Sequence, residues 1–288
     1  MWPRRFLFVL FVLLPTVHLH AQPRLQVVET LPLEYPEFVE PTAIAAGPLG
    51  RLFLADVGRN AVVRIDTLLQ VLYEFDAPED QLDILPYDVA VSGFQVYVLD
   101  AASNALLRYT DTGAYLDVLR SFREERIETP RAVDIDASGR VLLVNEAKHT
   151  GRVLDETQQE ESLVGGFGSR TGELSAPSGG AFAPDGSFFL SDTGNGRVQH
   201  FSRVGNLEPT HFSGIVEPRG MCTGPFGGLW VADSEAPGLH WYAPVSFEHS
   251  FLELADMRPI DVCILGNTAY VLSLDPPALL RVRVLRGE

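Results

Sequence analysis

Lysine is nearly missing from this chain: among its 288 residues there is one, Lys148, and the formal net charge is −16. A protein this acidic lacks the diffuse positive field that binding to a phosphate backbone needs. The composition therefore argues against nucleic acid and against anionic membranes as partners. We interpret the acidity as a means of keeping the protein soluble.

Long apolar runs are also scarce. Two arginines precede an apolar run of 12 residues from Phe6 to Val17, which is too short to span a bilayer but suits the core of a secretory signal. Ala21 is a small residue suited to the cleavage edge. We predict a signal peptide over residues 1–21 and a single domain over 22–288, secreted or periplasmic, with no membrane insertion after cleavage. An uncleaved membrane anchor is the alternative.

Helical periodicity is absent from the rest of the chain, which carries a repeat instead. A proline that opens a short apolar run recurs at steps of 45, 44, 47, 41 and 41 residues, at Pro41, Pro86, Pro130, Pro177, Pro218 and Pro259. A second column ends the next apolar run, at Asp56, Asp100, Asn145, Asp192, Asp233 and Ser273. A third column lies on the following run, at Arg64, Arg108, Arg152, Arg197, His240 and Arg281. This period suits four-stranded propeller blades.

The units divide into strands in the same way. In the first unit we predict strands over 42–46, 52–55, 62–65 and 68–75. The sixth unit supplies only three strands, whereas residues 25–31 resemble the missing outer strand. We therefore predict an all-β, six-bladed β-propeller with four-stranded blades, its ring closed by the N-terminal strand joining the last blade, which removes both exposed edges.

The fourth unit resembles the NHL repeat. It reads GFGSRTGELSAP over 166–177 and DGSFFLSDTGNGRV over 185–198, with the glycine-rich lead-in, the proline, the strand ending in Asp, and then Gly-Asn and Arg. The other units match more loosely, and together they cover nearly all of 22–288. The resemblance implies a six-bladed β-propeller. NHL-type propellers include interaction, RNA-binding and sensor domains, and related folds include lyases and lactonases, so the fold does not transfer an activity.

The Asp and Arg columns favour a structural role. They fall on two strands of one hairpin, so they can pair across it, and the Asp oxygens can accept N–H groups of the turn. Asp88 and Asp261 lie two residues after their prolines, where we expect them to bond nearby backbone rather than act in catalysis. Cys222 and Cys263 fall on neighbouring inner strands, too far apart for a disulfide, and we predict two buried free thiols.

No cofactor and no metal is expected from residue spacing. The histidines after the signal show no metal-binding pattern; they are His149, His200, His211, His240 and His249.

A site is expected where loops converge on the channel mouth. The residues beside the repeat prolines should point toward the axis; they are Thr42, Tyr87, Arg131, Ser178, Arg219 and Arg258. The three arginines and the tyrosine break the repeat, and a guanidinium binds a carboxylate or phosphate through two hydrogen bonds. We therefore expect a protein, peptide or small anionic ligand there. The alternative is that the arginines pair with loop acids such as Glu40, Glu128 and Glu217.

Without a catalytic constellation, the sequence favours a binding module over an enzyme. The resemblance leaves two enzyme classes open. A metal-dependent lactonase or hydrolase of the gluconolactonase type implies Glu, Asn and Asp around a divalent cation; Glu40 and Glu217 lie beside prolines, but arginines occupy the mouth. An amidating-lyase-like enzyme implies zinc, histidines, an arginine and a tyrosine. Tyr87 fits that pattern, but the histidines do not.

Overall fold

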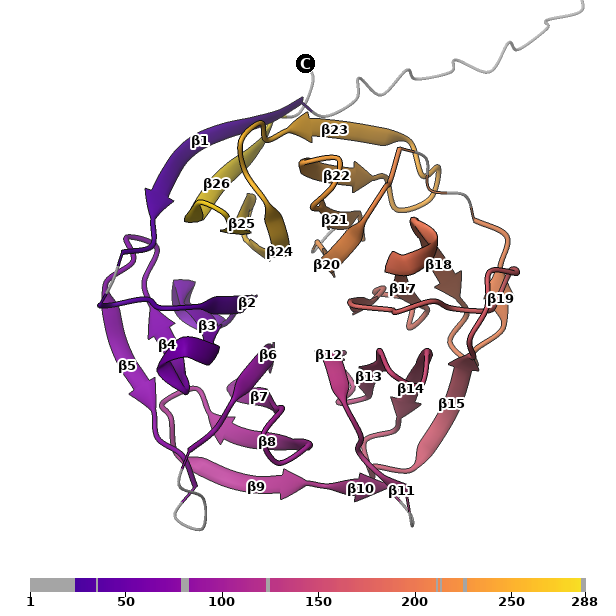
Figure 1. The fold of residues 1–288 in the computed structure, drawn as a ribbon, viewed down its shortest axis with the longest axis horizontal. Helices are drawn as coiled ribbons and strands as arrows, with labels where there is room; N and C mark the ends of the chain where they lie inside the picture. Colours follow the sequence, from indigo (N-terminus) through magenta and orange to yellow (C-terminus); the bar gives the residue numbers. More distant parts are fainter. Residues whose placement is uncertain are drawn as a thin grey trace, which may run out of the picture.

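The computed structural model of the protein describes residues 24–34, 36–78, 83–122, 125–210, 212, 214–224 and 227–285. They form six four-stranded antiparallel blades around a central axis (Figure 1), which confirms the predicted six-bladed β-propeller. The predicted signal peptide, residues 1–21, lies outside the described residues. Among the residues described, no helix is long and apolar enough to cross a membrane.

Each of the first three blades runs in chain order from the axis to the rim. Blade I contains β2 (Pro41–Ala46), β3 (Leu52–Asp56), β4 (Ala61–Ile65) and β5 (Val71–Phe75). Blade II contains β6 (Pro86–Ser92), β7 (Gln95–Asp100), β8 (Ala105–Thr110) and β9 (Tyr115–Leu119). Blade III contains β12 (Pro130–Ile135), β13 (Val141–Asn145), β14 (Thr150–Leu154) and β15 (Glu160–Gly165). Between blades II and III lies a small hairpin of β10 (Ser121–Phe122) and β11 (Glu125–Arg126).

The next two blades follow the same plan, with a shorter outer strand in blade IV. Blade IV contains β16 (Gly180–Phe182), β17 (Phe188–Asp192), β18 (Arg197–Phe201) and β19 (Leu207–Glu208). Blade V contains β20 (Pro218–Thr223), β21 (Leu229–Asp233), β22 (Gly238–Tyr242) and β23 (His249–Glu253). Three single-turn 3-10 helices complete the described elements: η1 (Pro48–Gly50), η2 (Val57–Arg59) and η3 (Thr193–Asn195).

Blade VI joins the two ends of the described chain. It contains β24 (Pro259–Leu265), β25 (Thr268–Leu274), β26 (Pro277–Leu285) and, as its outer strand, β1 (Arg24–Pro32). β1 runs antiparallel to β26, from Arg24 opposite Leu285 to Pro32 opposite Ala278. The predicted closure of the ring by the N-terminal strand is confirmed. β1 pairs with the edge of β26 that would otherwise be free, so blade VI is completed where the two ends of the chain meet.

The core lies between the blades. Six clusters of buried side chains each combine two neighbouring blades, so every interface in the ring has its own apolar filling. Between blades I and II, for example, the rings of Phe75 and Tyr109 lie 5.3 Å apart, and Phe53 packs edge-on against Phe75. Because β3 is covered on both faces, all of its residues are buried, which explains its continuous apolar sequence.

The two faces of the ring carry different connections. We call mouth face the one with the loops that lead into each inner strand and the turns between the second and third strands. The turn face carries the turns from the first to the second strand and from the third to the fourth. The inner strands start at the mouth face, where Pro41 lies opposite Asp56, and end at the turn face, where Ala46 lies opposite Leu52.

The aspartates of the second column hold the lead-in loops of the mouth face. The fully buried carboxylate of Asp56 accepts the backbone N–H groups of Val39 and Glu40, at 2.9 and 2.8 Å, and that of Arg59 at 3.1 Å. Asp233 does the same for four backbone N–H groups in blade V. These bonds satisfy donors that would otherwise be buried without partners.

The predicted pairing of this column with the third column occurs in blade IV, where Arg197 Nε lies 2.6 Å from Asp192 Oδ2, and in blade V, where His240 Nε2 lies 3.6 Å from Asp233 Oδ2. In blades II, III and VI the prediction is wrong, because the arginine pairs with an outer-strand carboxylate; the pairs are Arg108–Asp117, Arg152–Glu160 and Arg281–Glu29. The reason is register. Arg281 lies directly opposite Glu29 across the strand pair, whereas Ser273 lies opposite Ala278, nearer to the turn of its own hairpin.

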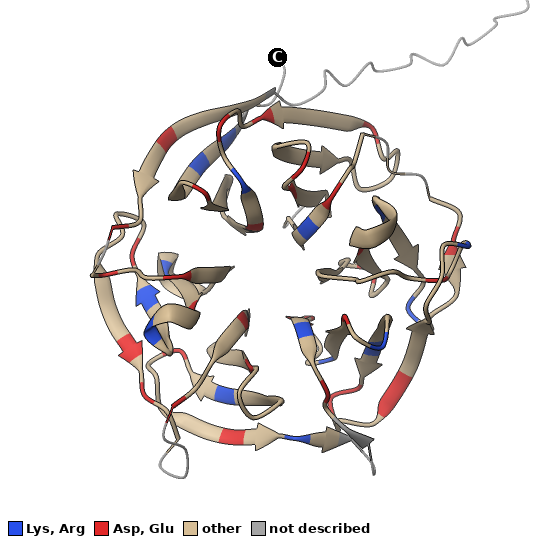
Figure 2. Ribbon diagram, viewed as in Figure 1, with Lys and Arg blue, Asp and Glu red and all other residues tan. Residues whose placement is uncertain are grey.

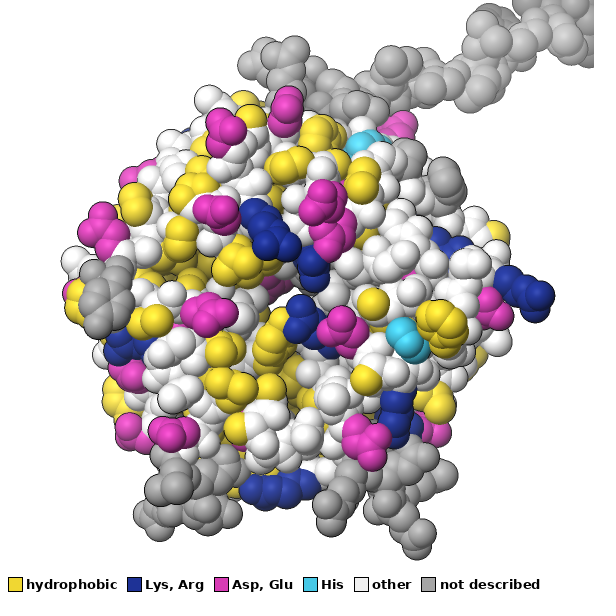
Figure 3. Space-filling model, viewed as in Figure 1, with side chains coloured by type: hydrophobic (Ala, Val, Ile, Leu, Met, Phe, Trp, Pro, Cys, Tyr) yellow, Lys and Arg dark blue, Asp and Glu magenta, His cyan; other side chains and the backbone are white. Residues whose placement is uncertain are grey.

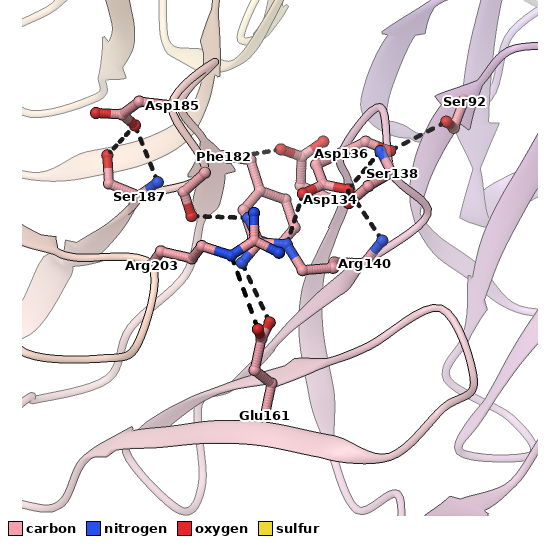
Figure 4. Close-up of polar contacts among 11 residues, drawn as sticks. Ser92, Asp134, Asp136, Ser138, Arg140, Glu161, Phe182, Asp185, Ser187 and Arg203 are labelled. Carbon is pink, nitrogen blue, oxygen red and sulfur yellow. Dashed lines mark hydrogen bonds and ion pairs between the residues drawn. The ribbon is translucent and has the colours of Figure 1, made fainter.

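A buried arginine ties blades III and IV together at the turn face (Figure 4). Arg140 Nε lies 2.7 Å from Asp136 Oδ2 within its own turn, and its Nη2 donates to the carbonyl of Gly186 in blade IV at 2.7 Å. Its guanidinium lies 4.8 Å from the ring centre of Phe182. Since its three nitrogens all have acceptors, we interpret Arg140 as structural.

Candidate functional site

The inner strands of the blades enclose a cavity of about 460 Å³ on the axis of the ring. All six residues predicted for the mouth line it: Thr42, Tyr87, Arg131, Ser178, Arg219 and Arg258. Figure 3 shows the centre of the ring hollowed, with arginine side chains gathered at the edge of the hollow beside acidic ones. Figure 2 places basic residues at the inner ends of β12 and β20 and just before β24.

β-Bulges direct four of these side chains, Thr42, Tyr87, Arg131 and Arg219, to the axis. In five blades the first proline of the inner strand pairs with the second column, and the register then shifts by a bulge. The bulge leaves Thr42, Tyr87 and Arg131 without a partner residue in the ladder, and Arg219 with Gly220 in blade V. A bulge re-aims its side chain, so the repeat proline marks where a variable residue faces the channel.

Arg131 and Tyr87 form one wall of the mouth. The guanidinium of Arg131 lies 4.1 Å from the ring centre of Tyr87, close enough for a cation–π contact. Arg131 Nε lies 3.3 Å from Glu146 Oε2. Burial lowers the pKa of Arg131, Glu146 opposes this change, and the positive charge of Arg219 adds to it. The two arginines are therefore near enough to repel each other.

The remaining two arginines differ in their partners. Arg219 Nε donates to Ser234 Oγ at 3.1 Å, and its Nη2 is paired with Glu217. Arg258 is exposed, and its backbone N–H donates to Ser273 Oγ at 3.1 Å. Within the described part of the chain, its guanidinium has no hydrogen bond or ion pair. Arg258 is thus the mouth cation whose charge no described residue neutralises.

The alternative of pairing with loop acids therefore holds in part. Glu217 pairs with Arg219 as expected, but the partner of Arg131 is Glu146. Glu128 binds Lys148 instead, at 2.9 Å.

The two hydroxyl residues of the predicted set connect neighbouring blades. Thr42 Oγ1 lies 3.4 Å from the carbonyl oxygen of Pro86 in blade II. Ser178 Oγ lies 3.3 Å from the carbonyl oxygen of Pro218 in blade V and 2.6 Å from Thr193 Oγ1. The structure brings both to the cavity wall, where their hydrogen bonds hold inner strands together.

Below the mouth, three aspartates line the channel: Asp88, Asp134 and Asp261. Each accepts a backbone N–H from the next blade in the ring; the acceptor–donor pairs are Asp88 with Val133 at 2.7 Å, Asp134 with Phe182 at 2.7 Å, and Asp261 with Ile44 at 2.8 Å. Gly220 makes room, since a Cβ there would lie 2.0 Å from Asp261 Oδ1.

The local bonds expected of Asp88 and Asp261 are also present, each to the following residue at 2.8 Å. The sequence reasoning missed Asp134. A charged residue inside the apolar run Ala-Val-Asp-Ile of an inner strand was the available signal.

These three carboxyl groups titrate abnormally. Burial raises the pKa of Asp88 to about 7, against the lowering effect of its two backbone bonds. Burial also raises the pKa of Asp134 to about 6. Burial and the nearby charge of Asp88 raise the pKa of Asp261 well above its usual range. A carboxyl group that titrates near neutral pH can both give and take a proton, so the channel holds groups of acid–base character below a cationic rim.

Metal-binding residues are not gathered anywhere in the described ranges: no three His, Cys, Asp or Glu side chains lie together in a way that could hold an ion. The three channel aspartates are each committed to backbone N–H groups. Cys222 and Cys263 are free thiols; Cys263 is buried as predicted, whereas Cys222 is only partly buried, and burial raises the pKa of both well above the usual range.

Fold and site together define a six-bladed propeller with a cation-rimmed, acid-lined channel. A streptogramin B lyase structure is similar, with a TM-score of 0.70 and 10% identity over 91% of this chain and 98% of that one. A gluconolactonase from Xanthomonas campestris aligns with a TM-score of 0.67 and 17% identity over 92% and 90% of the two chains.

A chain of a nidogen/laminin complex aligns with a TM-score of 0.64 and 13% identity over 80% of this chain and 86% of that one. No protein-family model matches the chain. No curated protein sequence matches it either. At these identities the likeness establishes the fold and leaves the activity open.

Proposed function

We propose that this propeller is a binding module whose channel mouth receives an anionic group, a carboxylate of a peptide, protein or small molecule. The observation that carries the proposal is Arg258, an exposed mouth cation with no charge partner among the described residues. Arg131 on the opposite part of the rim, stacked on Tyr87, offers a second guanidinium. A guanidinium fork matches a carboxylate in geometry and charge.

The cavity limits the size of what enters. A volume of about 460 Å³ suits a small ligand or the end of a peptide. The acids beside the arginines, Glu146 and Glu217, would repel a ligand with many negative charges. The proposed ligand therefore carries one or two carboxylates rather than a polyanionic chain.

We further propose that the repeat is of the NHL type and that the protein is secreted or periplasmic. The motif of the fourth unit supports the first proposal. The apolar run of residues 6–17 after two arginines supports the second.

The binding proposal is tested by calorimetric titration with short peptides that end in a free carboxylate, against the same peptides with amidated ends. We expect the amidated peptides to bind at least about tenfold more weakly, a difference of about 1.4 kcal/mol. Arg258→Ala should cause a similar loss. Arg203→Ala is the matched control, because Arg203 is also exposed but lies on the turn face. Equal affinity for both peptide forms would contradict the proposal.

A second candidate is hydrolysis of a small ester or lactone. It is favoured by Asp88, whose pKa of about 7 suits a general acid or base, and by the likeness to a gluconolactonase. Turnover of simple five- and six-membered lactones that disappears in Asp88→Asn but persists in Arg203→Ala would support it. No turnover by the wild-type protein between pH 5 and 9 would reject it.

A further inference from the structure

The most exposed apolar side chains gather on one face of the ring. Six large apolar residues with described side chains are at least 62% exposed, and five of these lie in connections of the turn face; these are Leu49, Leu68, Phe94, Val204 and Val245. The sixth, Phe167, lies on the mouth face. Single exposed apolar residues are ordinary, but their concentration at one end of a molecule indicates a contact surface.

We call these five residues, Leu49, Leu68, Phe94, Val204 and Val245, the five tips; they lie in turns of four different blades. Leu49 and Phe94 lie in first-to-second strand turns, near the channel, whereas Leu68, Val204 and Val245 lie in third-to-fourth strand turns, nearer the rim. Leu49 is 77% exposed and has a φ of 58°, a left-handed conformation that a leucine rarely adopts. Leu49 therefore combines a strained backbone conformation with an apolar side chain that faces solvent.

Several acids of this face are hydrogen-bonded within their turns. Asp66 accepts the backbone N–H groups of Leu68 and Gln70, at 2.8 and 2.9 Å. Asp136 and Asp185 accept N–H groups of their own turns in the same way. These bonds hold three carboxylates close to the turn backbone, whereas Glu156 and Glu248 of the same face are exposed and add to its negative charge.

The chain also enters the ring from this face. Arg24, the first described residue, lies opposite Leu285, at the end of β26 that is nearest to the turn between β24 and β25. The apolar run of residues 6–17 is therefore connected to the propeller on the same side as the five tips. In the alternative in which this run is an uncleaved anchor, the turn face is the side of the ring at which the anchored segment joins the propeller.

We propose that the turn face docks on a lipid surface, with the five tips entering the interfacial layer and the channel mouth pointing away from the membrane. Separate tips distributed around a ring suit a soft, fluid surface better than a shaped protein groove. The acidic charge of the protein makes a zwitterionic surface the fitting partner, since an anionic one would repel it.

The test is flotation of residues 22–288, which contain the whole closed ring, with phosphatidylcholine vesicles. We expect the protein to float with the vesicles, and Leu49→Asp combined with Phe94→Asp to reduce the bound fraction at least tenfold. Phe167→Asp, which places the same charge on the mouth face, should change it less than twofold. All three positions are exposed turns or loops, so thermal unfolding should show folded variants.

Several outcomes would overturn the proposal. These are a failure of the wild-type ring to float, equal losses in the turn-face and mouth-face variants, or a requirement for anionic lipid. A dimer detected by light scattering that the double variant dissolves, without flotation, would assign the turn face to self-association instead.

Discussion

Two sets of aspartates in this protein bind backbone N–H groups, and Asp233 of one set differs in acidity from Asp88 of the other. Those of the second repeat column bind the backbone of their own blade, as Asp56 and Asp233 do. Those of the channel bind the next blade, as Asp88 and Asp261 do. Burial by itself would raise the pKa of Asp233, but the His240 side chain and three backbone N–H groups lower it to about 2. The pKa of Asp88 is raised to about 7.

The difference between Asp233 and Asp88 follows from the donors and the charges that surround each carboxyl group. Asp233 receives four backbone N–H bonds and faces His240, whereas Asp88 receives two bonds and lies near other carboxylates. Each N–H bond favours the ionised form, and burial and like charges favour the neutral one. The repeated aspartate is therefore built for structure, while the unrepeated ones keep a proton that can be exchanged.

The largest effect is expected from matched substitutions in the two sets. Asp56→Asn replaces an acceptor oxygen by a donor that faces backbone N–H groups, and it should cost about 2–4 kcal/mol of unfolding free energy. Asp88→Asn also turns an amide N–H toward a backbone N–H, but it affects two backbone bonds rather than three and should cost about 1–2 kcal/mol. Urea denaturation of both variants measures the difference. Equal losses would contradict the expected difference between the two sets.

The dependence of stability on pH should separate the sets further. Asp88 has a folded pKa of about 7 against an ordinary value of 3.8, so between these values the folded state holds the proton more firmly. Its contribution is complete below pH 4 and is lost as pH rises through 7, by about 4 kcal/mol. Asp233 acts oppositely, since its contribution is lost as pH falls toward 2. Urea midpoints from pH 4 to 8 should decline less in Asp88→Asn than in the wild type; identical slopes would refute the assignment.

The smallest effect is expected from restoring the repeat in blade III. Asn145 accepts the N–H of Lys148 at 2.7 Å, and its Nδ2 donates to the carbonyl of Glu128. Asn145→Asp would turn a carboxylate toward that carbonyl and should cost about 1 kcal/mol. Thermal unfolding would detect this change as a lower midpoint. A higher midpoint would mean that the lead-in loop rearranges to donate N–H groups, as it does to Asp56 in blade I.

Much of the fold was predictable because the repeat shows in residue types and spacings that are local in the sequence. The prolines, the strand-ending aspartates and the spacing predicted the six blades, and residues 25–31 predicted the closing strand. The six mouth residues were predictable as a set, since each lies beside a repeat proline. In four of them, Thr42, Tyr87, Arg131 and Arg219, the proline also precedes the bulge that turns the side chain to the axis.

The partners of the charged residues were not predictable in this way. The sequence suggested that Arg281 would pair within its hairpin, yet it pairs with Glu29, 252 positions away in the chain. Arg131 forms its ion pair with Glu146 rather than with Glu128. Asp134 reaches the backbone of Phe182 only because neighbouring inner strands approach closely around the axis.

By itself, the sequence determined the repeat, the strand order, the acidic charge and the residues that would face the channel, because these follow from spacing and side-chain type. Tertiary structure alone decided which arginine stays unpaired, which carboxyl groups keep a proton, and which apolar tips share a face. Those properties depend on distances between blades, and no local pattern sets the distance between residues that meet only when the ring closes.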